Sequence, residues 1–242
     1  DEDGSGSTTL SGSDIDSTDL TYSVSGGSDI TATVDSDSVS FTAPANYNGS
    51  ESFTATVSDG EFTSSQTFTV TVNAVNDAPA LAAVDAVSFD EDSSTSITLS
   101  GSDIDGDGLT YSVSGGTDIT ATVNGFTVTF TASANFSGSE DFTATVTDGS
   151  LSGSQSFTVT VTPVNDAPTL AAVPGVSFDE DGSGSTTLSG SDVDGDDLTY
   201  IITEGINITA ILDGTTITFT PDQDFNGSES FTATVSDGEL SS

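Results

Sequence analysis

The sequence repeats itself with a period of 89 residues. The stretch DEDGSGSTTLSGSD at 1–14 returns as DEDSSTSITLSGSD at 90–103 and unchanged at 179–192. The phrase GSESFTATVSDG at 49–60 returns, nearly unchanged, at 138–149 and 227–238. Self-similarity at a fixed period indicates a tandem array in which each period is one structural unit. The chain of 242 residues is shorter than three full periods. We therefore predict a complete repeat at 76–164, between a repeat at 1–75 that lacks its first strand and a repeat at 165–242 that lacks its last.

Within each period, apolar residues occupy every second position, and Thr or Ser fills most of the positions between them. This alternation is typical of a strand with one buried face. In the middle repeat the alternating groups are Ile97/Leu99, Leu109/Tyr111/Val113, Ile119/Ala121/Val123, Phe126/Val128/Phe130, Phe142/Ala144/Val146 and Phe157/Val159/Val161. Val87 and Phe89 add a first strand, and Gly- and Asn-rich turn sequences separate the groups. The pattern predicts an all-β chain of seven-stranded β-sandwiches in a linear array.

The charge of the chain has one sign only. It contains 39 Asp and Glu residues and no Lys, Arg or His, so its formal net charge is −39. Such a chain repels itself in the compact state, and bulk salt or bound metal ions must compensate. Nucleic acid and anionic membrane surfaces are excluded as partners. No apolar run is long enough to insert into a membrane.

Acidic residues and Asn gather in the predicted loops. Examples are Asp90-Glu91-Asp92, the DIDGD sequence at 103–107, Asp148-Gly149 and Asn165-Asp166. Alternate loops of a sandwich lie at the same end, so these oxygen ligands should cluster there. The chain has no Cys or His, and oxygen-only ligand sets suit Ca²⁺, which takes about six to eight oxygens. The 103–108 sequence is not an EF-hand loop, because Ser114 stands at its last position and a strand follows.

The phrase VNDAPALAAV at 75–84 recurs as VNDAPTLAAV at 164–173. Together with the DxD loop and the FTATVxDG strand, it resembles the bacterial cadherin-like tandem repeats of giant surface adhesins. The resemblance covers the whole chain and implies an Ig/cadherin-like sandwich with Ca²⁺ bound at each domain junction. The phrase also has a purely structural interpretation, in which Asn-Asp turns the chain and the Pro keeps the preceding Ala extended.

Carried over residue by residue, the resemblance implies one set of metal ligands for each junction. For the first junction the set is Glu2, Asn76, Asp77, Asp103, Asp105 and Asp148. For the second junction the set is Glu91, Asn165, Asp166, Asp192, Asp194 and Asp237. The Asp-Arg-Glu tripeptide of cadherins is missing, with Glu51 and Glu140 as its nearest substitutes, and Ala78 and Ala167 replace a ligand Asn. The resemblance therefore implies fewer or weaker ions per junction than in a cadherin.

The composition also separates the classes of function. Without His, Cys, Lys or Arg, catalytic triads, Schiff bases and phosphate clamps are impossible, and a carboxylate pair would not normally be copied in every repeat. We therefore expect no enzyme. The absence of Trp disfavours carbohydrate binding, and the Thr-x-Thr pattern that could suit ice binding follows equally from the β-propensity of Thr. We predict a calcium-rigidified stalk of a large extracellular or cell-surface adhesin, whose partners are neighbouring repeats of the same chain. The alternative is an extracellular filament or sheath in which identical chains associate.

Overall fold

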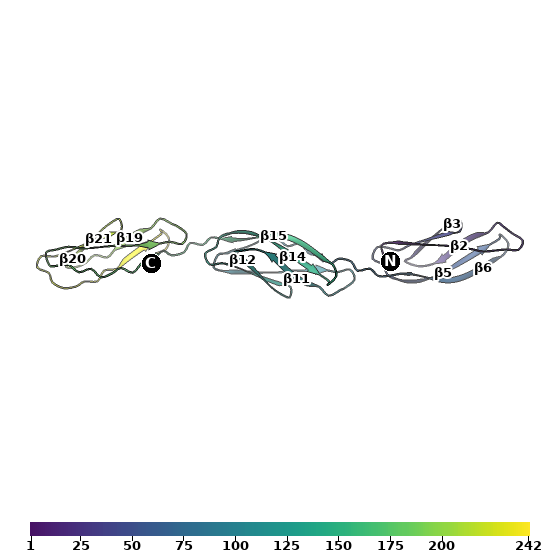
Figure 1. Ribbon diagram of the computed structural model, residues 1–242, viewed down its shortest axis with the longest axis horizontal. Helices are drawn as coiled ribbons and strands as arrows, with labels where there is room; N and C mark the ends of the chain where they lie inside the picture. Colours follow the sequence, from purple (N-terminus) through teal and green to yellow (C-terminus); the bar gives the residue numbers. More distant parts are fainter.

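The computed structural model describes all 242 residues and consists of strands and loops without a helix. Three domains follow one another end to end in a rod (Figure 1). The N-terminus lies at the end of the first domain that faces the second domain (Figure 1). The predicted all-β class and the tandem sandwich architecture are confirmed. No helix in the structure has the length and apolar character needed to cross a membrane.

The second domain is the most complete sandwich. One layer is a four-stranded sheet in the order β11-β14-β15-β8, and the other is a three-stranded sheet in the order β12-β13-β9. A short antiparallel pair, β7 and β10, adds to these seven strands. The strands of the second domain are β7 (Ala80–Leu81), β8 (Val87–Asp90), β9 (Ser94–Thr98), β10 (Gly101–Ser102), β11 (Thr110–Gly115), β12 (Ile119–Asn124), β13 (Thr127–Ala132), β14 (Gly138–Thr147) and β15 (Ser152–Thr162). Only β8 pairs in parallel, along β15.

The first domain has two three-stranded sheets, β1-β4-β3 and β2-β5-β6. Its strands are β1 (Ser5–Thr9), β2 (Thr21–Gly26), β3 (Thr31–Asp35), β4 (Ser38–Thr42), β5 (Gly49–Ser58) and β6 (Thr63–Val72). The third domain has a three-stranded sheet, β17-β21-β20, and two pairs, β19-β22 and β16-β18. Its strands are β16 (Thr169–Leu170), β17 (Gly184–Thr187), β18 (Gly190–Ser191), β19 (Thr199–Ile202), β20 (Ile208–Asp213), β21 (Thr216–Pro221) and β22 (Ala233–Ser236).

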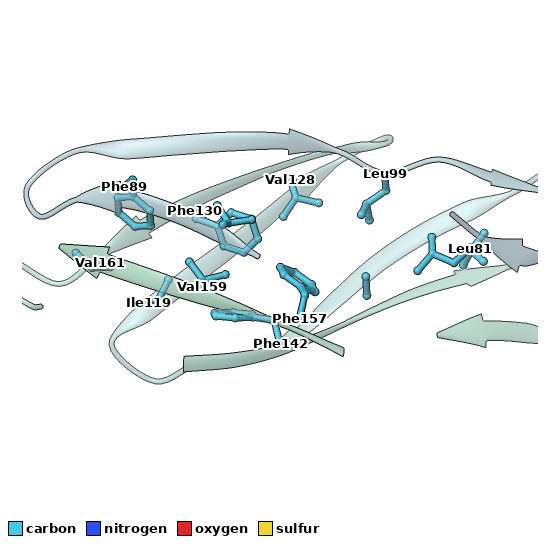
Figure 2. Close-up of a cluster of buried hydrophobic side chains, with 13 residues drawn as sticks. Leu81, Phe89, Leu99, Ile119, Val128, Phe130, Phe142, Phe157, Val159 and Val161 are labelled. Carbon is cyan, nitrogen blue, oxygen red and sulfur yellow. The ribbon is translucent and has the colours of Figure 1, made fainter. Parts of the chain in front are cut away.

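The core of the second domain lies between its two sheets. Thirteen buried apolar side chains form one cluster there. The rings of Phe130, Phe142 and Phe157 point into the space between the layers (Figure 2). Their centroids are 5.4–6.0 Å apart, in edge-to-face or tilted contacts that add to the burial of the rings. The apolar residues at alternate positions of the strands thus face the core, as expected.

Phe126 is an exception to this alternation. It was expected to point inward with Val128 and Phe130, but its side chain is 60% exposed. Asn124 pairs with Thr127, so Gly125 and Phe126 form the tight turn between β12 and β13. Gly125 has a φ of +63°, which a glycine at the first turn position adopts easily. The prediction for Phe126 was wrong because the turn, rather than the strand, contains this residue.

Candidate metal site at the domain junctions

Two short linkers connect the domains, one around Asn76–Pro79 (the first junction) and one around Asn165–Pro168 (the second junction). Both prolines are buried, and Pro168 is among the most deeply buried residues of the chain. A proline also restricts the preceding residue to extended conformations. The linkers therefore leave the sandwiches with little slack.

A glutamate from the preceding domain holds each linker where it leaves the sandwich. At the first junction, Glu2 donates its backbone N–H to the carbonyl of Asn73 (2.9 Å), and its Oε1 accepts from the Val75 N–H (2.6 Å). At the second, Glu91 repeats this geometry with Thr162 (2.9 Å) and Val164 (2.6 Å). Both glutamates are only 6% exposed. Burial of a carboxylate is costly unless it is paired or binds a metal, so these side chains require compensation.

The DxD loop of the following domain holds the other side of each linker. The Oδ1 of Asp103 accepts from the backbone N–H groups of Asp105 (3.0 Å) and Asp107 (3.2 Å), which folds the loop around its carboxylate. Asp105 in turn accepts from the Asp77 N–H at 2.8 Å. At the second junction, Asp192, Asp194 and Asp166 occupy the corresponding positions, with the same 2.8 Å linker contact. The loop and the linker therefore form one unit.

The two linker asparagines lie beside this unit as hydrogen-bond donors. Asn76 Nδ2 donates to Asp148 Oδ2 (2.8 Å), and Asn165 Nδ2 donates to Asp237 Oδ2 (2.9 Å). The Asn76 contact is the largest cause that lowers the pKa of Asp148, and Asn165 acts in the same way on Asp237. These two aspartates therefore stay ionised beside the linker.

Carboxylates from both domains and from the linker lie close together at the first junction. One oxygen each from Glu2, Asp77 and Asp105 lies within 4.8 Å of the others, and these residues belong to the first domain, the linker and the second domain. Five buried oxygens at the two junctions have no hydrogen-bond partner: Glu2 Oε2, Asp77 Oδ2, Asp103 Oδ2, Asp166 Oδ2 and Asp192 Oδ2. An unpartnered buried polar atom is rare in a folded protein and needs an explanation.

The two linker aspartates, Asp77 and Asp166, are also destabilised in their charged form by burial and by neighbouring negative charges. Burial raises the pKa of Asp77, and the negative charges of Asp105, Asp3, Glu2 and Asp103 raise it further. Burial likewise raises the pKa of Asp166, followed by repulsion from Asp194, Asp92, Glu91 and Asp192. A divalent cation between these oxygens would supply both the missing positive charge and the missing partners. The donor set is purely oxygen and fits Ca²⁺.

The structure also points to residues that sequence reasoning missed. Asp3 and Asp92 act on the linker aspartates, and both have a left-handed backbone, with φ near +57° and +55°. Asp196 joins Asp192 and Asp194 in a second three-carboxylate group. The signal was present in the sequence, because all three residues of the DED triplet and every second residue of the DxDxD loop are acidic, but only part of each motif had been assigned.

Glu51 and Glu140 occupy a different place from that of a junction ligand. The carboxylate of Glu140 accepts from the backbone N–H groups of Thr117 (2.9 Å), Asp118 (3.2 Å) and Ile119 (2.9 Å) in its own domain. These bonds, that of Thr117 first, lower the pKa of Glu140. Glu51 holds the equivalent turn of the first domain. Both glutamates therefore stabilise a turn within a sandwich.

Comparison with known proteins agrees with this tandem sandwich architecture. The model of the bacterial Ig domain family matches residues 1–73, 76–162 and 165–242. The chain therefore belongs to the bacterial Ig domain family, in three tandem copies. No curated protein matches the chain.

Solved structures with low sequence identity are similar to the chain. Titin domains I67–I69, as an E-to-A variant, match 99% of this chain and 89% of theirs, with 11% identity and a TM-score of 0.40. Human protocadherin-24 EC1-2 (form II) matches 64% of this chain and 86% of its own, with 18% identity and a TM-score of 0.43. The endo-fucoidan hydrolase MfFcnA4 has 20% identity and a TM-score of 0.32, and this chain spans only 40% of its length. These likenesses concern the type of fold alone.

Proposed function

We propose that the chain is a calcium-rigidified extender in the stalk of a large extracellular or cell-surface adhesin. The observation that supports this function best is the carboxylate group of Glu2, Asp77 and Asp105, because its three members come from two domains and the linker between them. An ion held there would connect consecutive domains and remove the freedom of the hinge. The partners of each repeat would be its neighbours in the same chain.

The chemistry of this function is mechanical rather than catalytic. The glutamate would hold the ion from the preceding domain, the linker aspartate from the middle and the DxD loop from the following domain. Binding of an ion to the folded junction alone also stabilises the fold by mass action. A repeated junction with the same residues would extend this stiffness along the whole array.

The test combines calcium titration with small-angle scattering of the full chain. We expect calorimetry to detect calcium at both junctions, and scattering to show a stiff rod with calcium and bending after chelation. Asp77→Asn together with Asp166→Asn keeps the side-chain shape but removes one charge from each site, so the chain should bend even with calcium present. Asp85→Asn, an exposed acid elsewhere in the chain, is the matched control and should behave as wild type.

Two outcomes would overturn the proposal. One is a calcium titration without binding at the wild-type junctions. The other is full recovery of stiffness in ~1 M NaCl without calcium, since salt with a Debye length near 3 Å screens diffuse repulsion but ligates nothing. Mg²⁺ should substitute poorly, because it demands octahedral geometry and loses its water reluctantly.

A further inference from the structure

The third domain exposes three isoleucines where the other two domains have small polar residues. Ile201, Ile206 and Ile211 are 64%, 89% and 60% exposed. Their counterparts in the other repeats are all Ser or Thr: Ser112, Thr117 and Thr122 in the second, and Ser23, Ser28 and Thr33 in the first. Single exposed apolar residues are normal on a protein surface, but three such replacements within one short segment of one repeat need a reason.

The exposure of these positions is a property of the fold. In the second domain, which is a complete sandwich followed by another domain, Ser112, Thr117 and Thr122 are all exposed. The sheet β17-β21-β20 of the third domain has the same strand order as β9-β13-β12, and β20 pairs with β21 along six residues, as β12 does with β13. β20 and its sheet are therefore built like their counterparts in the complete sandwich.

The three isoleucines, which we call the isoleucine edge, lie along two unpaired strand edges. β20 pairs only with β21, and β19 pairs only with β22, so each is an edge strand of its sheet. The two strands are in contact, and Ile206 lies in the loop between them. Edge strands present free backbone N–H and C=O groups, which proteins usually protect with Lys, Pro or a bulge. β20, with the sequence ITAILD and an unbroken register, has none of these.

The charge of the chain determines what can cover this edge. Asp213 ends β20, and Glu204 stands in the preceding loop where both other repeats have a glycine; both acids are exposed. The chain has no Lys, Arg or His and a formal charge of −39, so a second copy would bring like charges together. A partner with Lys or Arg beside its apolar residues would complement both features of the edge.

We propose that the isoleucine edge binds an extended basic segment of another protein, which adds to β20 as a further strand. Main-chain hydrogen bonds to β20 provide the affinity in such strand addition, and alternate side chains provide the specificity. Apolar residues of the segment pack on the isoleucines, and its Lys or Arg residues face Asp213 and Glu204. This interaction goes beyond the role of the chain as an extender and needs no ion at the junctions.

The experiment uses the full chain and the labelled peptide KTVTVTVK, in which Val and Thr alternate between terminal lysines. We expect saturable one-to-one binding by fluorescence anisotropy in ~0.15 M NaCl, which screens exposed charges more than about 8 Å apart. The peptide KTTTTTTK keeps the charge without the valines, and ETVTVTVE keeps the valines but reverses the charge of both ends. Each of these controls should bind at least about tenfold more weakly.

Hydrogen exchange locates the peptide on the chain. Bound KTVTVTVK should slow exchange at residues 208–213, because their free backbone groups would then be paired. The result should be the same with calcium and after chelation. It is therefore independent of the proposed junction function.

Protein variants test the side chains. Ile201→Ser, Ile206→Thr and Ile211→Thr together give the third domain the residues of the second. This triple variant should bind KTVTVTVK at least about tenfold more weakly, while its circular dichroism spectrum stays that of the wild type. Phe62→Thr removes an exposed apolar side chain of the first domain and should bind as wild type.

Four outcomes would overturn the proposal. They are no saturable binding, equal binding of KTVTVTVK and either control peptide, full binding by the triple variant, and slower exchange only outside β20. Concentration-dependent association of the chain with itself that is lost in the triple variant would also overturn it, in favour of a second copy.

Discussion

The second and third domains share the same alternation of apolar residues but differ in how many of these side chains are buried. Thirteen apolar residues form the buried cluster of the second domain, whereas only four are buried in that of the third. Phe142 is 1% exposed, while its counterpart Phe231 is only partly buried. The difference follows from β15, which pairs with both β14 and β8 and closes one layer of the sandwich. The printed sequence stops at Ser242, so the third repeat contains counterparts of only the first two residues of β15.

The comparison teaches that one strand organises several others. Because most of the counterpart of β15 lies beyond the printed sequence, residues 176–179 and 228–232 of the third domain form no strand, although their sequences match β8 and β14 closely. β-Propensity is therefore a measure of fit to a packed, paired surface more than of local backbone preference. The alternation of apolar residues specifies the β-sandwich fold, but the apolar side chains become fully buried only when β15 completes the four-stranded sheet.

The largest expected effect comes from truncating the equivalent phenylalanines. Phe142→Ala should lower the free energy of unfolding of the second domain by about 3–5 kcal/mol, because the cavity forms in a closed core. Phe231→Ala should lower that of the third domain, in the chain as given, by less than about half as much, because the ring is only partly buried. Native-state hydrogen exchange measures each domain separately, which is necessary since a multidomain chain need not unfold in one step. Equal losses in the two domains would contradict the comparison.

A smaller effect should come from the glutamate that holds a turn in each domain. Hydrogen bonds from Thr117, Ile119 and Asp118 keep the pKa of Glu140 low against the effect of burial. At Glu229 burial is the largest influence and raises the pKa, but hydrogen bonds from Asn207, Ile206 and Ile208 together outweigh it and leave the pKa lowered. A lowered folded-state pKa gives stability that is complete above the unfolded value and is lost as the pH falls through the folded value.

The melting temperature of the second domain should therefore fall as the pH drops below about 4.5, the ordinary region for a glutamate. Glu140→Gln should lower the melting temperature by a few degrees at neutral pH and flatten this acid dependence, and Glu229→Gln should do the same in the third domain. Differential scanning calorimetry from pH 7 to 3 measures both. Glu61→Gln, at an exposed turn, is the control. If the variants kept the full acid dependence of the wild type, these carboxylates would not be its source.

The smallest effect is expected on the outer face of the third domain. Ile201 and Ile211 are 64% and 60% exposed, where the second domain has Ser112 and Thr122. Ile211→Thr should change the free energy of unfolding by less than about 0.5 kcal/mol, because it leaves the interior unchanged. Denaturant unfolding measures this change. A loss above about 1 kcal/mol would mean that the outer face also contributes to the difference between the domains.

Much of the candidate site was predictable because it depends on local motifs. Hard oxygen ligands recur at fixed places in every repeat, and the alternation of a sandwich brings those loops to the same end. The structure brings Glu2, Asp77, Asp103 and Asp105 together at the first junction, and the electrostatics of Asp166 involve Glu91, Asp192 and Asp194 at the second. The binding of calcium itself stays a prediction. Asp3, Asp92 and Asp196 were not assigned to the junction sets, although the acidic motifs that contain them are visible in the sequence.

The sequence by itself determined the period, the all-β class and the inward face of each strand, because these follow from the spacing of apolar residues along the chain. Tertiary structure alone decided that Phe126 lies in a turn and that Glu140 holds a turn of its own domain. The first depends on the register in which β12 pairs with β13, and the second on hydrogen bonds between residues 117–119 and Glu140 of β14, about 20 residues further along the chain. Local alternation fixes which side chains can be buried, but only the pairing of distant strands closes the layer that buries them.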